Sequence, residues 1–165
     1  MAAVMHLIVE LRSDHRQVIG LALELKQALE ARTLGRAIHI VEELDRKLGP
    51  HMRFEEKHLY RALEQFIGDT HIEQLKVEHD DVADLLLGLK LILKRGSVPA
   101  EIIPLASNGL RELIVHAADC DGRILLIERL SQDERSRLLE RLVASRREPV
   151  ILTDWKGAAT WSSES

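Results

Sequence analysis

Four stretches of the chain repeat apolar residues in alternating steps of four and three, and this period constrains the fold more than any other feature. They span Val4 to Leu29, Ile38 to Ala62, Ile72 to Leu93 and Ile102 to Ile127. Such spacing gives each of four amphipathic helices one apolar stripe. The connections near residues 31–33, 68–69 and 96–98 are short, so consecutive helices are expected to run antiparallel. The sequence therefore predicts an all-α fold, an up-down-up-down four-helix bundle.

Two pairs of residues have the spacing of a capping box, in which a Ser or Thr and a Glu three residues later satisfy the first turn of a helix. Thr70 and Glu73 stand at the start of the third stripe, and Ser131 and Glu134 precede a short apolar run after the fourth. The second pair predicts a short fifth helix that packs across the bundle.

The helical period is lost from Glu148 onward. The chain is accordingly divided into a bundle with its accessory helix, residues 1–147, and an extended arm with a polar tail, residues 148–165. Trp155 and Trp161 could dock on the body or on a partner, and for Trp155 the expected role is to cover one end of the bundle.

Histidine occupies the buried stripe of all four long helices. The positions are His15 in the first stripe, His51 and His58 in the second, His79 in the third and His116 in the fourth, with Glu55 between the two in the second. Unpaired polar groups in a core cost several kcal/mol, a cost that a bound metal ion removes. Imidazole with carboxylate, and without a cluster of thiols, suits iron, manganese, zinc or copper.

The heights of these histidines along the bundle are consistent with one layer. At about 1.5 Å per residue, His15 and His51 stand level across the first connection, and His79 and His116 stand level across the third. The match between His51 and His79 across the second connection is poorer. Either the connection has other boundaries, or the helix has a defect at Gly49–Pro50.

These residues resemble the hemerythrin-like, or HHE cation-binding, domain. The resemblance lies in the lone His15, the run H-x-x-x-E-E-x-x-L-Y from His51 to Tyr60, the pair E-H ending at His79, and His116 followed by acidic residues. It covers most of residues 5–130. The resemblance implies a non-haem di-iron centre, two irons per chain with carboxylate and oxo or hydroxo bridges. Its implied metal ligands are His15, His51, Glu55, His79, His116 and Asp121.

Two departures from the family pattern bear on this ligand set. Leu75 stands where oxygen-carrying hemerythrins have a second histidine in helix three, so the ligand count is closest to the iron-centre repair branch. That branch has glutamate four residues after the helix-four histidine, where this chain has Cys120. Asp121 reaches in, or Cys120 coordinates as a thiolate, or the second metal is held loosely. Asp121 is preferred, although a five-residue step turns about 140° around a helix, and Cys120 is expected to be a small buried filler.

The remaining polar residues near the motif have supporting roles in this interpretation. His58 is a hydrogen-bond donor behind the ligands, a substitute ligand, or a histidine at the edge of the core. Glu56 and Tyr60 orient ligands, or the tyrosine ring caps the core. His6, His39 and His71 are expected at the surface.

Composition excludes several classes of function. A formal charge of −4 and five aromatic residues provide no footprint or stacking platform for nucleic acid. No apolar run approaches the roughly 20 residues that span a bilayer, so no membrane partner is expected and a cytoplasmic location is predicted. The single cysteine excludes an internal disulfide. A phosphotransfer bundle is disfavoured because a motif like H-x-L-K-G is absent.

The predicted function is a di-iron protein that binds or senses a diatomic ligand, O2 or NO, or that takes part in iron or redox stress. Peroxide is a further candidate ligand. One alternative is a metal-dependent enzyme resembling an oxidase or peroxidase. Another is a helical interaction module with a vestigial metal site, and Leu and Ile on helices three and four could support a homodimer.

Overall fold

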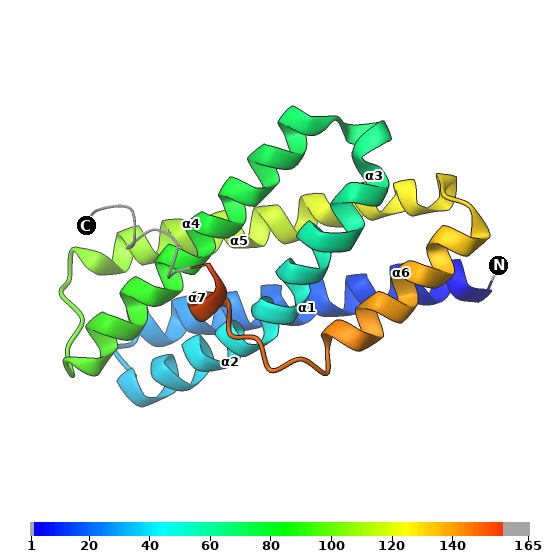
Figure 1. Cartoon of the computed structure of the whole chain (residues 1–165). Coiled ribbons are helices and arrows are strands. Elements are labelled where there is room, and N and C mark those ends of the chain that lie inside the picture. The colour runs from blue at the N-terminus through cyan, green and yellow to red at the C-terminus, as the bar shows by residue number, and fades with distance from the viewer. Residues whose placement is uncertain (1, 157–165) are drawn as a thin grey trace.

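The computed structural model describes residues 2–156, with side chains from residue 6 onward, and this part of the chain is helical without strands (Figure 1). The elements are α1 (Ala2–Glu30), α2 (Leu34–Phe54), the π-helical turn η1 (Glu55–Leu59), α3 (Tyr60–Ile67), α4 (Asp69–Lys94), α5 (Ile102–Arg123), the 3-10 turn η2 (Ile124–Arg129), α6 (Gln132–Ser145) and α7 (Leu152–Trp155). The predicted all-α class is confirmed. The polar tail with Trp161 and the side chain of Val4 lie outside the described residues.

In the bundle of four long helices, α1 lies diagonally opposite α4, and α2 lies diagonally opposite α5. α1 contacts α2 and α5, and α4 contacts the same two helices. This arrangement is consistent with a four-helix bundle. α6 lies against α1 and α2, as expected for a fifth helix that packs across the bundle. No helix among residues 2–156 is long and apolar enough to cross a membrane.

Two large apolar clusters fill most of the interior, and a polar layer separates them. On α1, Leu11 belongs to one cluster and Val18 to the other, and the buried His15 lies between them. Leu113 on α5 and Ile124, the first residue of η2, belong to different clusters in the same way. The apolar periodicity therefore continues on both sides of the polar layer.

The irregular part of the second helix is η1, and not the Gly49–Pro50 step. α2 continues through Pro50 to Phe54. The π-helical turn η1 follows, and here the Tyr60 N–H donates to the Glu55 carbonyl. This i→i+5 bond defines a π-helix, which is frequent at functional sites. It places Glu55 and Tyr60 on one face, although they are five residues apart. The proposed defect at Gly49–Pro50 was therefore wrong in its position.

The two capping-box predictions differ in outcome. At Ser131 the box is present: the hydroxyl accepts from the Glu134 N–H at 3.3 Å, and the Ser131 N–H donates to the Glu134 carboxylate at 2.9 Å. At Thr70 the prediction was wrong. α4 already begins at Asp69, after Gly68 with φ 79°, and has no side-chain cap. Glycine adopts this left-handed conformation without the strain that a Cβ would cause, so the turn itself sets the start of α4.

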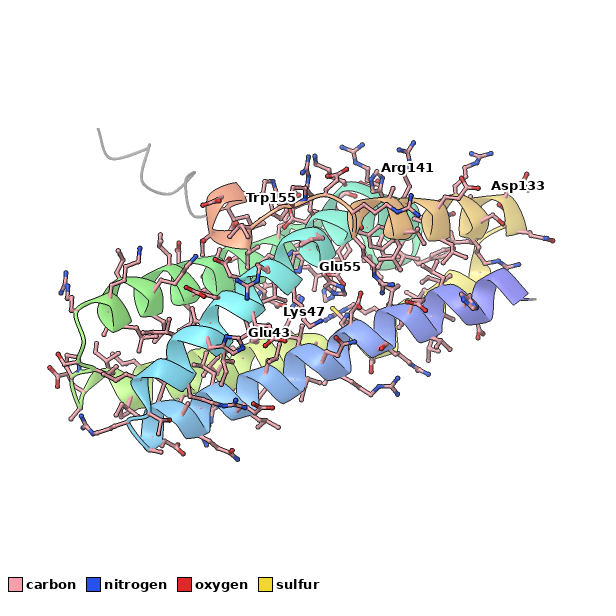
Figure 2. All side chains as sticks on the ribbon, turned by 90° about the horizontal axis from the view of Figure 1, so that it is seen from below. Glu43, Lys47, Glu55, Asp133, Arg141 and Trp155 are labelled. Atoms are coloured by element: carbon pink, nitrogen blue, oxygen red, sulfur yellow. The ribbon has the colours of Figure 1, made fainter. Side chains whose placement is uncertain are left out.

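The arm after α6 is extended only in part. Leu152–Trp155 forms α7, which packs on the side of the bundle made by α2 and α4 and not over its end (Figures 1 and 2). The backbone N–H and the hydroxyl of Thr153 donate to the buried Asp45 at 2.9 and 2.7 Å. Beside it, the arm crosses α2 so closely that a Cβ on Gly49 would lie 2.1 Å from the Val150 carbonyl oxygen. Glycine at this position is what allows the arm to lie against the helix.

Candidate metal centre

Four imidazole rings, one from each long helix, form two close pairs inside the bundle. Nε2 of His15 on α1 lies 3.1 Å from Nε2 of His51 on α2. Nε2 of His79 on α4 lies 3.1 Å from Nε2 of His116 on α5. All four residues are buried. These are the same two pairs that counting along the helices placed at equal heights.

The Glu55 carboxylate lies between the two pairs. Its Oε1 is 3.6 Å from Nε2 of His15 and 3.4 Å from Nε2 of His51, and its Oε2 is 3.2 Å from Nε2 of His79. Glu55 is buried inside the bundle (Figure 2), and its Oε1 has no hydrogen-bond partner. A buried, unpartnered carboxylate oxygen costs free energy unless it receives a cation or a proton. Each oxygen of Glu55 thus faces one histidine pair.

Every ring directs its other nitrogen, Nδ1, to a separate carboxylate. The pairs are His15 with Asp121 at 2.7 Å, His51 with Asp14 at 3.3 Å, His79 with Glu56 at 2.9 Å and His116 with Glu78 at 2.6 Å. This carboxylate–histidine arrangement is typical of metal ligands, because it fixes the tautomer and turns the free Nε2 lone pair toward the ion. Two such lone pairs facing each other at 3.1 Å repel unless a cation or a proton lies between them. The residues present therefore fit a metal ion.

In the absence of a metal ion, a proton takes part of this role at the first pair. Burial alone would lower the pKa of His51, but the charge of Glu55 and the hydrogen bond to Asp14 outweigh burial and raise it to about 10. Burial alone would raise the pKa of Glu55, but the charge of His51 and the close approach of the His15, His51 and His79 rings hold it well below its usual range. Glu55 is therefore ionised, and a metal ion must displace a proton from His51 to bind.

The surroundings of the second pair shift the pKa values of its two rings in opposite directions. Burial opposes a charge on His79, but hydrogen bonds to Glu55 and Glu56 raise its pKa above the ordinary value. Burial lowers the pKa of His116, and the neighbouring charge on His79 lowers it further. The two rings thus differ in basicity, and His79 takes up an additional proton more readily than His116.

Two cations from the C-terminal part of the chain hold two of the outer carboxylates. Arg146, just after α6, donates to both oxygens of Asp14 at 2.9 Å. Lys156, just after α7, lies 2.7 Å from the Glu56 oxygen that also accepts from His79. The residues after the bundle therefore support the carboxylates that orient His51 and His79.

Sequence reasoning missed Asp14, Glu78, Arg146 and Lys156. The acidic residue before a histidine is visible in the pairs Asp14–His15 and Glu78–His79. Each carboxylate, however, contacts the histidine of a neighbouring helix, since Asp14 pairs with His51 and Glu78 with His116. Only the packing of the helices shows this exchange.

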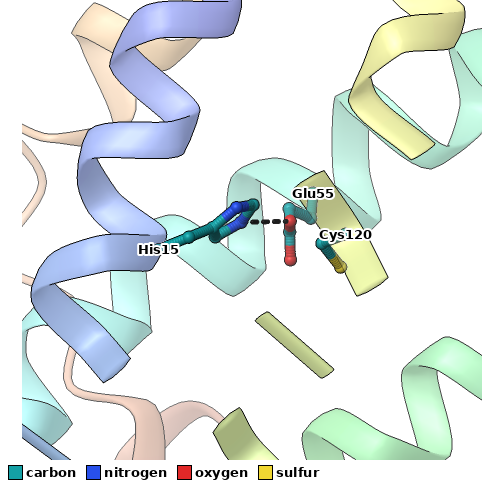
Figure 3. A group of neighbouring side chains, drawn as sticks. All are labelled: His15, Glu55 and Cys120. Atoms are coloured by element: carbon teal, nitrogen blue, oxygen red, sulfur yellow. Dashed lines mark ion pairs between the residues drawn. The ribbon is translucent and has the colours of Figure 1, made fainter. Parts of the chain in front are cut away.

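The structure brings together most of the residues that the sequence singled out. Two groups have ligand atoms that all lie within 4.8 Å of one another: His15, Glu55 and Cys120, and Glu55, His79 and His116. Figure 3 shows the Glu55 carboxylate between the His15 ring and the Cys120 side chain. These groups share Glu55, so two sets of candidate ligands adjoin at this carboxylate.

The other predicted residues lie around this centre or apart from it. The Tyr60 hydroxyl donates to Oε2 of Glu55 at 3.2 Å and lies 3.1 Å from Nε2 of His79. Its ring packs in a small cluster with Leu75, the residue that stands in place of a histidine. His58 instead lies beside Phe54, with ring centroids 6.0 Å apart, and lines a surface cavity. The predicted surface histidines are exposed: His6, His39 and His71.

Comparison with known protein families identifies the chain. The model of the hemerythrin HHE cation binding domain matches residues 6–125. The chain belongs to this hemerythrin family. No curated protein and no solved structure matches it. The four histidines and Glu55 all lie within the matched range, whereas Arg146 and Lys156 lie beyond it. Cation binding, the property in the family's description, agrees with the two groups of His, Glu and Cys side chains that could hold a metal ion.

Proposed function

We propose that this hemerythrin-family protein binds two iron ions in the polar layer of the bundle. The observation that supports this most directly is the convergence of four Nε2 atoms on the two oxygens of one buried carboxylate. His15, His51 and Oε1 of Glu55 would hold one ion. His79, His116 and Oε2 of Glu55 would hold the other, so Glu55 would bridge the two.

The charge around the layer favours cations. Five carboxylates contact the four rings, namely Glu55, Asp14, Glu56, Glu78 and Asp121. Arg146 and Lys156 balance two of them. Neutral imidazoles add no positive charge, so divalent ions would neutralise the excess. Imidazole and carboxylate ligands suit iron, the metal that the family resemblance implies.

The second part of the proposal is that the centre binds or senses a diatomic ligand, O2 or NO. A bound iron pair would supply reversible electron transfer and a coordination position for such a ligand. Tyr60 would place a hydroxyl donor beside that position, since its oxygen lies next to both Glu55 and His79. Apolar clusters lie on both sides of the layer along the bundle.

Elemental analysis of protein expressed in iron-supplemented medium tests the first part. We expect about two irons per chain and no more than about one in His116→Ala, with His39→Ala as the control because that ring is exposed. Retention of both irons by His116→Ala would contradict the proposed site.

Spectroscopy tests the second part. Protein reduced without oxygen should change its visible spectrum on addition of O2 or NO, and loaded protein that responds to neither would end this part of the proposal. Steady-state consumption of peroxide would instead favour an enzyme at the same centre.

A further inference from the structure

We infer that Cys120 binds metal as a thiolate together with His15 and Glu55, and that Asp121 orients His15 without binding metal. This inference rests on the proposed metal centre and specifies its ligand set on α5. It reverses the preference that the sequence alone suggested.

The sulfur of Cys120 lies among the inward-facing ligand atoms. Its Sγ belongs to the group with His15 and Glu55 in which all ligand atoms are within 4.8 Å of one another. It is also 3.6 Å from Nε2 of His116, because a step of four residues keeps both side chains on one face of α5. The residue is 2% exposed. A metal ion near Glu55 Oε1, the oxygen without a partner, would have this sulfur within the same small group.

Asp121 already has another role. Its Oδ1 accepts from Nδ1 of His15 at 2.7 Å, on the side of the ring away from His51 and Glu55. In this position Asp121 completes a set in which each of the four rings has one outer carboxylate. A turn of Asp121 toward the ion would leave Nδ1 of His15 without that partner. Asp121 also lies five residues after His116, and this step rotates its side chain away from the inward face of α5.

The surroundings of the sulfur allow a thiolate once an ion is present. Burial raises the pKa of the Cys120 thiol, and the charge of Glu55 raises it further, so the metal-free residue is a thiol. Binding would form one metal–sulfur bond and release the thiol proton to solvent. The guanidinium of Arg123, 3.7 Å from Sγ, would then face the negative sulfur. One position of the centre would thus have a soft ligand that the other lacks.

Cobalt(II) titration of the metal-free protein tests the inference, because thiolate ligands give Co²⁺ a sulfur-to-metal charge-transfer band in the near ultraviolet that imidazole and carboxylate ligands do not give. We expect this band in the wild-type protein. At saturating Co²⁺, Cys120→Ser should lose it completely. Cys120→Asp should bind Co²⁺ without the band, because it replaces the sulfur by a carboxylate at the same place. Asp121→Asn is the matched control and should retain the band, although it needs about 10- to 100-fold more cobalt, the usual effect of losing an outer partner.

The outcomes separate this inference from the proposed function. Uptake of Co²⁺ by the wild type without the band, or a band that persists in Cys120→Ser, would overturn the thiolate and leave the metal centre standing. Loss of the band in Asp121→Asn at full occupancy would overturn the division of roles on α5. No uptake of Co²⁺ by the wild type would overturn both proposals. Circular dichroism of each metal-free variant checks that its helices are formed.

Discussion

The variant Glu55→Gln tests the central geometry, in which one carboxylate serves two ions. Glutamine keeps the shape of the side chain but removes the charge and replaces one ligand oxygen by an amide NH2. His15 and His51 lie 3.6 and 3.4 Å from one Glu55 oxygen, and His79 lies 3.2 Å from the other. The substitution therefore affects both ion positions at once, and we expect Glu55→Gln to hold one ion at most.

The magnitude follows from linkage between binding and folding. Free metal at 100 times its Kd stabilises a folded protein by about 2.7 kcal/mol per ion. For a chain of this size, 1 kcal/mol raises Tm by roughly 2–4 °C, so two ions should raise the wild-type Tm by roughly 10–20 °C. At the same metal concentration, Glu55→Gln should lose at least half of this rise.

The assay is thermal unfolding with and without ferrous iron under anaerobic conditions, and the rise in Tm is taken within each variant, so that differences in metal-free stability cancel. Glu42→Gln is the matched control, because Glu42 is an exposed carboxylate on the same helix. It should show the full wild-type rise. A Glu55→Gln protein that gains as much in Tm as the wild type would refute the bridging role of Glu55.

Three further predictions concern the histidine layer and the C-terminal arm. In the metal-free protein, His51 has a folded pKa of about 10 against about 6.5 when unfolded, so its contribution to stability, up to about 5 kcal/mol, is full below pH 6.5 and lost as pH rises to 10. Denaturant titrations that show stability rising over this range would contradict it. Gly49→Ala puts a Cβ against the Val150 carbonyl, so the free energy of unfolding should fall by roughly 1–3 kcal/mol. Hydrogen exchange in the arm should become faster. Exchange in the arm as slow as in the wild type would be inconsistent with the close crossing of the arm over α2. Lys156→Met removes the cation on Glu56 and should weaken ferrous iron binding up to about tenfold, which a calorimetric titration measures, whereas unchanged affinity would mean that the arm does not support the centre.

Most of the contacts of the residues around the four histidine rings could not be predicted from the sequence. Period and spacing identified the ring-bearing positions, because a polar residue in an apolar stripe is visible in one dimension. The partners of those rings were not visible. Asp14 contacts His51, 37 positions away, and Lys156 contacts Glu56 across most of the chain. Such contacts depend on how the helices are rotated about their axes, and no repeat in the sequence records that rotation.

By itself, the sequence determined the helical class, the polar layer within the apolar stripes, and the pairing of His15 with His51 and of His79 with His116. Each of these follows from residue counts along regular helices, at 3.6 residues per turn. Only the tertiary structure decided where that regularity fails. The π-turn that begins at Glu55 places its carboxylate between the two pairs, and the roles of Cys120 and Asp121 depend on side-chain directions within one turn of α5. In the π-turn, the backbone hydrogen bond spans one residue more than in an α-helix, and this alters which side chains face the interior. The sequence pattern does not encode that hydrogen bond.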